Sequence, residues 1–175
     1  MKLDLGVERD HIESLTKANG TSALAEMIWN SLDADSTQIK IDYTRTSLGG
    51  FSQILVSDDG NGLEYSKAQS VFGRIGGSEK KNNQLSPGGR QYHGKEGKGR
   101  YKALALGDLV VFQSKYANNG QVNEFTITID RNNLSFSEIS ELKILPKSET
   151  TKGFHIKIEN VNQDVGFPEV RPFES

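Results

Sequence analysis

Cysteine is absent from this chain of 175 residues. The absence excludes a disulfide framework and any metal site built from thiolates. Long apolar runs are absent as well, because no stretch reaches the roughly 18 residues that a membrane-spanning helix needs. Residues 1–6 also lack the apolar core of a signal peptide. We therefore expect a protein of the cytoplasm, or of the nucleus if its source is eukaryotic, with no membrane partner.

Neither sign of charge dominates the sequence. The 21 Lys and Arg residues and the 23 Asp and Glu residues give a formal net charge of −2, so the bulk charge does not favour binding to DNA. The length fits one compact α/β domain with a proper core. Two common phosphate-binding patterns are also missing, the P-loop and the dinucleotide fingerprint Gly-x-Gly-x-x-Gly. A phosphate site in this chain must therefore use a different cradle.

A helix with a polar stripe is predicted, with Thr21 or Ser22 as its N-cap. At about 100° per residue, Glu26, Asn30 and Asp33 fall on one narrow stripe away from the apolar side. An amide oxygen suits Mg²⁺, and a carboxylate one turn away can orient or deprotonate water. The stripe therefore either converges on one ligand or holds three ordinary exposed polar residues.

An acidic turn follows the second of two predicted strands, which cover residues 37–43 and 52–57. This turn runs from Asp58 to Gly62 and contains two carboxylates and two glycines. A carboxylate buried at a strand end can accept a hydrogen bond from an exocyclic amine such as that of adenine. The turn is also typical of a simple hairpin. The helix predicted at about 64–72 and the polar stripe before the strands argue against the hairpin.

Residues 73–107 are rich in glycine and in positive charge. Glycines let backbone N–H groups turn toward an anion, and a helix predicted at about 98–106 would begin beside that anion. The rival interpretation is a disordered basic loop. The remaining predicted elements are a helix at about 9–17, a mobile lid across 75–98, and strands at 109–114, 123–129 and 153–159.

The order and chemistry of these segments resemble the GHKL superfamily, which comprises gyrase B-type topoisomerases, Hsp90 chaperones, sensor histidine kinases, and the MutL and MORC ATPases. The first box, residues 26–34, is closest to the MutL wording, and MORC-like proteins share the general pattern. The resemblance implies an α/β fold, the two-layer α/β sandwich of the Bergerat type, with a mixed sheet and helices on one face. It also implies ATP and Mg²⁺ as cofactors, an ATP-binding domain over residues 1–160 and a linker over residues 161–175.

The resemblance assigns roles to four acidic or amide side chains. It implies that Glu26 is the catalytic general base for the attacking water and that Asn30 is the metal ligand for Mg²⁺. It places Asp33 at the nucleotide's edge and makes Asp58 the residue that reads adenine.

Further nucleotide contacts implied by the resemblance lie in glycine-rich turns. Gly60 and Gly62 are expected to let adenine approach the backbone. The contacts expected in the basic region are the turn residue Ser78, the lid glycines Gly94, Gly97 and Gly99, and the charge partners Lys95, Lys98 and Arg100.

Two positions and one segment depart from the family pattern. Phe154 follows Gly153 where the family usually has a threonine that bonds near the adenine, and Thr150 or Thr151 could substitute by a register shift. Asp59 stands where many relatives carry asparagine, and it either faces solvent or alters the local electrostatics. The third box, residues 93–100, departs from the MutL wording, so mismatch repair is not assigned.

The function that the resemblance implies is an ATPase, slow in the isolated domain, whose lid closure drives dimerisation or clamp action in a larger protein. Glu26 favours hydrolysis, because sensor kinases generally carry asparagine there. A histidine-kinase-like catalytic domain and a nucleotide-binding interaction module without turnover stay open as alternatives. Trp29, beside the polar stripe, belongs either to the core or to a dimer face.

The expected partners are ATP or ADP, a second copy of the parent protein, and a nucleic acid or a protein client. Many GHKL ATPases use a lysine from a following domain at the γ-phosphate, and no such domain fits after residue 160. We therefore expect either an N-terminal fragment or a small protein that turns ATP over slowly.

Overall fold

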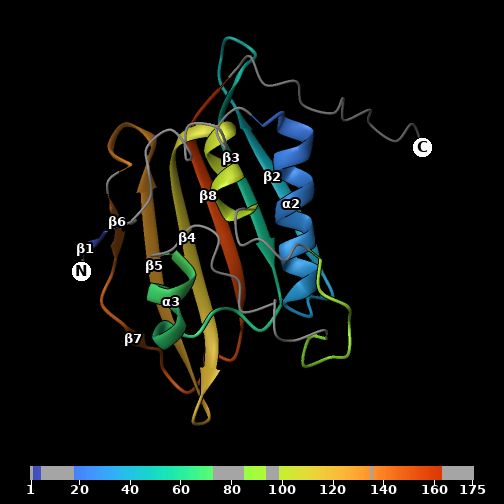
Figure 1. The fold of residues 1–175 in the computed structure, drawn as a ribbon, viewed down its shortest axis with the longest axis vertical. Coiled ribbons are helices and arrows are strands. Elements are labelled where there is room, and N and C mark those ends of the chain that lie inside the picture. Colours follow the sequence, from blue (N-terminus) through green and yellow to red (C-terminus); the bar gives the residue numbers. More distant parts are fainter. Residues whose placement is uncertain (1, 5–17, 73–84, 94–98, 135, 163–175) are drawn as a thin grey trace.

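The computed structural model describes residues 2–4, 18–72, 85–93, 99–134 and 136–162. Its strands form one sheet in the order β1-β6-β5-β4-β8-β3-β2, with the short β7 paired to β5 (Figure 1). The strands are β1 (Lys2–Asp4), β2 (Ile39–Arg45), β3 (Phe51–Asp58), β4 (Gly107–Asn118), β5 (Gln121–Asp130), β6 (Phe136–Ile139), β7 (Lys143–Ile144) and β8 (Gly153–Val161).

The strand directions correct one detail of the expected fold. Every strand pairing among the described residues is antiparallel, so the expectation of a mixed sheet is wrong. The connection from β3 to β4 sets these two strands in the same direction, but β8 lies between them and runs opposite to both. Because β8, the last strand in the sequence, separates β3 from β4, the parallel pairing that a strand–helix–strand crossover would otherwise make does not form.

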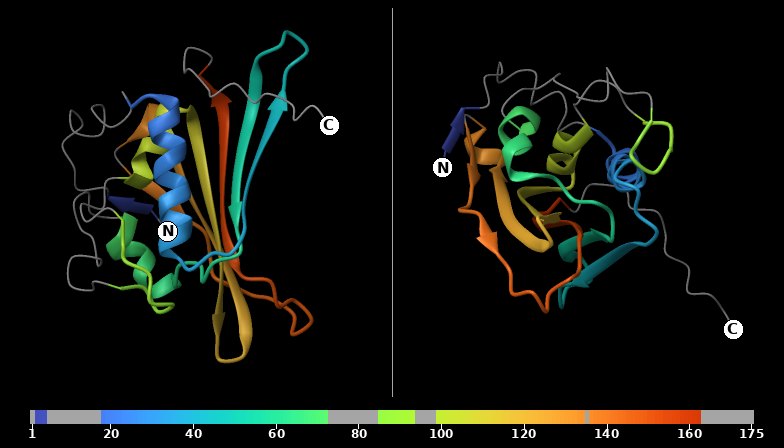
Figure 2. Two further views of the ribbon diagram at one scale, coloured as in Figure 1. Left: turned by 90° about the vertical axis from the view of Figure 1, so that its right-hand side faces the viewer. Right: turned by 90° about the horizontal axis from the view of Figure 1, so that it is seen from below.

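Helices cover one face of the sheet. They are α2 (Gly20–Asp33), α3 (Tyr65–Phe72) and the 3₁₀ helix η2 (Gly99–Ala105). Figure 2 shows all three on the same side of the strands. Along β8, the residues that alternate with buried Ile156 and Ile158 include Lys157 and Glu159, which form an ion pair at 3.0 Å. The expected α/β fold with helices on one face is confirmed.

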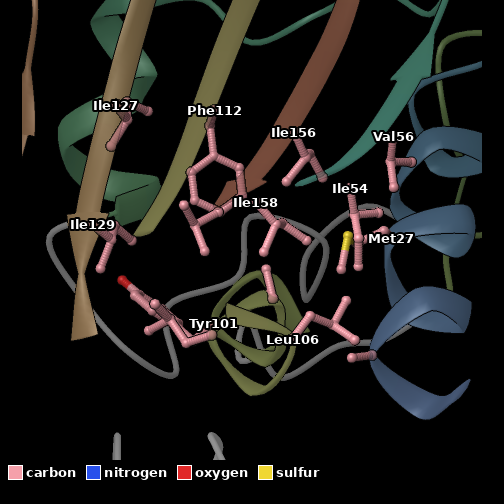
Figure 3. Close-up of a cluster of buried hydrophobic side chains, with 14 of the residues drawn as sticks. Met27, Ile54, Val56, Tyr101, Leu106, Phe112, Ile127, Ile129, Ile156 and Ile158 are labelled. Carbon is pink, nitrogen blue, oxygen red and sulfur yellow. The ribbon is translucent and has the colours of Figure 1, made fainter. Parts of the chain in front are cut away.

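Alternating apolar residues on four strands build the core between sheet and helices. The buried pairs are Ile54 and Val56 on β3, Val110 and Phe112 on β4, Ile127 and Ile129 on β5, and Ile156 and Ile158 on β8. Figure 3 shows most of these side chains directed toward Met27 of α2 and Tyr101 of η2. The Tyr101 hydroxyl donates to the Phe72 carbonyl oxygen at 2.8 Å, and burial raises its pKa to about 12. Tyr101 therefore links η2 to the end of α3.

The helix that carries the polar stripe begins earlier than expected. Its N-cap is Asn19 rather than Thr21 or Ser22, because the Asn19 side chain accepts a hydrogen bond from the Ser22 backbone N–H at 2.7 Å. None of the described helices is both long enough and apolar enough to cross a membrane.

Other boundaries also differ from the expectation. The helix expected at about 98–106 is the 3₁₀ helix η2, and β1, β6 and β7 were not predicted. β8 includes Val161, the first residue of the expected linker, which pairs with Gly107 of β4. The helix expected at 9–17, most of the expected lid, and residues 163–175 lie outside the described residues.

Candidate functional site

The end of β3 places the Asp58 carboxylate against α2. Its Oδ2 accepts a hydrogen bond from the Ser31 hydroxyl at 2.6 Å. Its Oδ1 accepts hydrogen bonds from the backbone N–H groups of Gly60 at 2.9 Å and Phe154 at 3.1 Å. A carboxylate oxygen can accept about two hydrogen bonds, so Oδ2 can take one donor more than the described residues provide. The strand end therefore holds a buried carboxylate that can receive another donor.

Two glycines let the turn after β3 pack closely on its neighbours. A Cβ at Gly60 would lie 2.7 Å from the carbonyl oxygen of Ala34, which follows α2. Gly62 has a φ of +68°, and a Cβ there would overlap the Lys115 carbonyl oxygen on β4. The chain itself thus requires both glycines, whereas their expected contact with adenine stays a prediction.

The start of β8 contains Phe154, which stands where the GHKL pattern usually has a threonine. Phe154 pairs with Asp58 and donates its backbone N–H to that carboxylate. Thr150 and Thr151 are exposed and precede the strand, and the Thr151 N–H donates to Glu149 instead. The register therefore places neither threonine opposite Asp58, and the Phe154 backbone N–H bonds that carboxylate instead.

Glu26 lies on α2 beside the start of η2. Lys102 donates from Nζ to Glu26 Oε2 at 3.1 Å, and the two side chains are 29% and 24% exposed, respectively. A Cβ at Gly99 would overlap the Glu26 carboxylate. The carboxylate thus occupies the space that a side chain at Gly99 would fill.

Asn30 lies one turn after Glu26 on α2 and is half-buried. Within the described ranges, no group of three or more His, Cys, Asp or Glu residues is arranged to hold a metal ion. Mg²⁺ is commonly held by one or two protein oxygens together with phosphate oxygens and water. The Asn30 amide therefore fits a Mg²⁺ ion that arrives with a polyphosphate better than an ion held by the protein alone.

Asp33, expected at the nucleotide's edge, binds another part of the chain. Its Oδ1 accepts a hydrogen bond from the His93 backbone N–H at 2.9 Å, and the residue is buried. The His93 ring stacks on the Trp29 indole, with centroids 3.6 Å apart and planes 6° apart. Because Trp29 is 41% exposed, the first of its two interpretations, packing in the core, is wrong. A contact of Asp33 with nucleotide stays a prediction.

Residues 85–93, which we call the docked segment, lie against the C-terminal end of α2. The Asp35 carboxylate accepts hydrogen bonds from the Ser86 hydroxyl at 2.5 Å and the Gly88 N–H at 2.9 Å. Arg90 donates from Nη1 to the Ser36 carbonyl oxygen at 2.9 Å and to the Leu32 carbonyl oxygen in the last turn of α2 at 3.4 Å, and a cation stabilises the C-terminal end of a helix. These contacts fix the chain immediately before residues 94–99, which contain Gly94, Gly97 and Gly99.

Asp59 is exposed, as one of its two interpretations had it. Its carboxylate accepts hydrogen bonds from the Thr37 hydroxyl and from the backbone N–H groups of Thr37 and Gln38. These bonds, led by that of the Thr37 hydroxyl, lower the pKa of Asp59 to about 2. Asp59 thus ties the turn after β3 to the residues that precede β2.

The expected phosphate contacts are only partly described. Outside the described residues lie Ser78, Gly94, Lys95, Gly97 and Lys98. The Arg100 guanidinium lies over the Phe72 ring, with its central carbon 5.3 Å from the ring centre. Arg100 thus packs against α3, and its role as a phosphate partner stays a prediction.

Sequence reasoning missed Ser31 and Lys102 as parts of the site. Ser31 falls on the side of α2 that the pattern assigns to the core, and its hydroxyl is the signal that could have found it, since a buried hydroxyl needs a partner. Lys102 counted only as one charge of the basic region. Residues three apart eclipse each other in a 3₁₀ helix, so Lys102 lies on the same side as Gly99.

Comparison with known proteins adds one match. A family model described as histidine kinase-, DNA gyrase B-, and HSP90-like ATPase matches residues 18–164. The matched range includes α2, the turn after β3, η2 and β8, which together build the site. No curated protein matches the chain significantly.

Proposed function

Because the chain belongs to the family of histidine kinase-, DNA gyrase B- and HSP90-like ATPases, we propose that it binds ATP with Mg²⁺ and hydrolyses it. The observation that carries the proposal is the buried Asp58 carboxylate, whose Oδ2 accepts one hydrogen bond among the described residues and can accept a second. Family membership supports nucleotide binding. Hydrolysis is the finer part of the proposal and rests on Glu26.

Asp58 is proposed to read the base. Adenine presents an exocyclic amine, which can donate to Oδ2 beside the Ser31 hydroxyl. Guanine presents a carbonyl oxygen at the same ring position, and a carboxylate would face that oxygen with no hydrogen between them. Because such a mismatch leaves buried polar groups unpaired, we expect clear preference for ATP over GTP.

The two ends of the proposed site lie along one helix. Ser31 of α2 holds Asp58, and Glu26 precedes Ser31 by five residues on the same helix. At a rise of 1.5 Å per residue, this separates them by about 7.5 Å along the axis. Asn30 lies between them, next to Ser31. The arrangement supports a nucleotide that extends from a base at Asp58 to a terminal phosphate near Glu26.

Asn30 is proposed to hold Mg²⁺ through its amide oxygen. When bound, Mg²⁺ would neutralise the charge that develops on the phosphates. From the sequence, the proposed phosphate contacts are Ser78, Gly94, Lys95, Gly97, Lys98, Gly99 and Arg100. Glycines in such a segment let backbone N–H groups face the phosphate oxygens.

Glu26 is proposed to orient the attacking water and to accept its proton. The water oxygen forms a bond to the terminal phosphorus, and the bond from that phosphorus to the bridging oxygen of ADP breaks. The products are ADP and inorganic phosphate, so neither an oxidant nor a reductant is required. A role for Asp33 at the nucleotide's edge would require it to bind nucleotide while it accepts the His93 N–H.

Dimerisation in the parent protein is a further part of the proposal. The family resemblance supports a clamp in which the nucleotide-bound domains pair. The exposed indole of Trp29, stacked on His93 of the docked segment, is a surface feature next to the proposed phosphate end. Sedimentation of the full-length protein with and without a non-hydrolysable ATP analogue tests this, and an unchanged monomer would contradict it.

Calorimetry with a non-hydrolysable ATP analogue tests the proposed function. We expect binding that strengthens when Mg²⁺ is present, and an Asn30→Ala variant should lose this dependence on Mg²⁺ while it keeps binding ADP. Lack of binding to ATP and ADP alike would contradict the proposal. Phosphate release by the full-length protein then separates the alternatives: binding without release indicates an interaction module, and transfer to a protein histidine indicates a kinase.

A further inference from the structure

We propose that Lys102 restrains Glu26: its ammonium group holds the carboxylate against Gly99, and a terminal phosphate, when it binds, competes with Glu26 for that ammonium. The inference rests on the proposed function, because it needs a nucleotide at this site. It makes Lys102 a positioning residue that links the arrival of a third phosphate to the release of Glu26.

The contacts of the Glu26 carboxylate carry the first step. Oε2 receives the Lys102 ammonium at 3.1 Å, and the rest of the carboxylate packs over the bare backbone of Gly99. Both side chains are less than a third exposed, so water screens this ion pair less than it screens a surface pair. While the ammonium holds Oε2, that oxygen has one acceptor position fewer for a water molecule.

The position of Lys102 in the fold carries the second step. Lys102 lies one 3₁₀ turn after Gly99, which is the last glycine of the third box, residues 93–100. Its four-carbon stem lets the ammonium move without any movement of the backbone. A terminal phosphate of ATP carries about two negative charges against the single charge of a carboxylate, and bonds between ionised groups are the strong ones. A phosphate near Glu26 therefore attracts the ammonium more strongly than the Glu26 carboxylate does.

A double-mutant cycle in the full-length protein tests the proposal. The variants are Glu26→Gln, Lys102→Gln and both together, and calorimetry measures the affinity of each for a non-hydrolysable ATP analogue and for ADP. With Lys102 present, Glu26→Gln abolishes the competition and also removes a repulsive charge. With Lys102 replaced, it removes only the repulsion. We therefore expect Glu26→Gln to strengthen analogue binding by at least about threefold more with Lys102 than without it.

The sign of this coupling decides the outcome. A static ion pair predicts the opposite order, because an unpaired Glu26 repels phosphate more than a paired one does. The role of Lys102 would be overturned if Glu26→Gln had an equal or larger effect in the Lys102→Gln background, or if the coupling for ADP equalled that for the analogue. Either result would leave the proposed function intact. Absence of analogue binding to the unmutated protein would overturn the proposed function and this inference together.

Two further variants guard the interpretation. Lys157→Gln removes the lysine from an ion pair of similar length on the face of the sheet away from the helices, and it should leave analogue affinity unchanged. Lys102→Met takes the place of Lys102→Gln in the cycle if the latter fails to fold.

Discussion

Replacing Asp58 with asparagine changes one oxygen of a buried carboxylate into an amino group and barely alters the volume of the side chain. The carbonyl oxygen of the amide can still accept the backbone N–H groups of Gly60 and Phe154. The amino group then faces Ser31, whose hydroxyl can turn and accept instead of donating. The fold should therefore survive Asp58→Asn with a loss of about 1 kcal/mol in the free energy of unfolding.

The effect on nucleotide binding should be much larger. At the position of Oδ2, the amino group meets the exocyclic amine of adenine, so two donors face each other. A hydrogen bond to a charged group contributes about 1.5–3 kcal/mol, which corresponds to a loss of about 10- to 150-fold in affinity. Because the base is common to both nucleotides, ATP and ADP should lose affinity by the same factor.

Calorimetry with ADP and a non-hydrolysable ATP analogue measures this loss, and Asp59→Asn is the matched control. Asp59 is the neighbouring carboxylate, but it is exposed and accepts its hydrogen bonds from Thr37 and Gln38. Its replacement should leave both affinities unchanged. A folded Asp58→Asn protein that binds both nucleotides normally, or that loses only ATP, would refute the assignment of Asp58 to the base.

Four other outcomes can be measured. In the full-length protein, Glu26→Gln should bind the analogue at least as tightly as the unmutated protein and slow phosphate release by about 100-fold or more, and normal release would remove Glu26 from the mechanism. Gly99→Ala adds a methyl group where the Glu26 carboxylate lies, so phosphate release should fall while ADP affinity holds; equal losses would indicate a misplaced domain rather than a displaced Glu26. Since the pKa of Asp59 is lowered from 3.8 to about 2, its contribution to stability is fully present above about pH 4 and is lost as the pH falls toward 2. Urea unfolding of Asp59→Asn should lack this pH dependence, and curves that match the unmutated protein would contradict the Thr37 contact. His93→Ala should change the fluorescence of Trp29, the single tryptophan, and an unchanged spectrum would mean that the His93 ring does not stack on the indole.

Regular elements with strong periodicity could be predicted from the sequence. The helix that carries Glu26 and Asn30 and the strands around Asp58 follow from local patterns of polar and apolar residues. The strands β1, β6 and β7 were not predicted, because they are short and depend on partners distant in the chain. Strand direction escaped for a related reason, since only the insertion of β8 between β3 and β4 makes every pairing antiparallel.

Side-chain contacts between distant segments could not be predicted in this way. Asp58 and Glu26 could be named as site residues, but their partners Ser31 and Lys102 depend on how α2, β3 and η2 meet. The hydrogen bonds from the docked segment to Asp35 depend on the backbone φ of +61° at Asp35 and on residues about 50 positions away. A local pattern carries no information about such a pairing.

The central place of β8 orders the events by which the site is assembled. Residues 153–161 bridge β3 and β4, so during synthesis at the ribosome the two hairpins β2–β3 and β4–β5 are complete before the strand that joins them has emerged. Asp58 receives the Phe154 N–H only at that moment. Nascent chains that end before residue 153 would therefore hold two parts of the sheet that no strand pairing joins, and the Asp58 end of the nucleotide site would be completed late in folding.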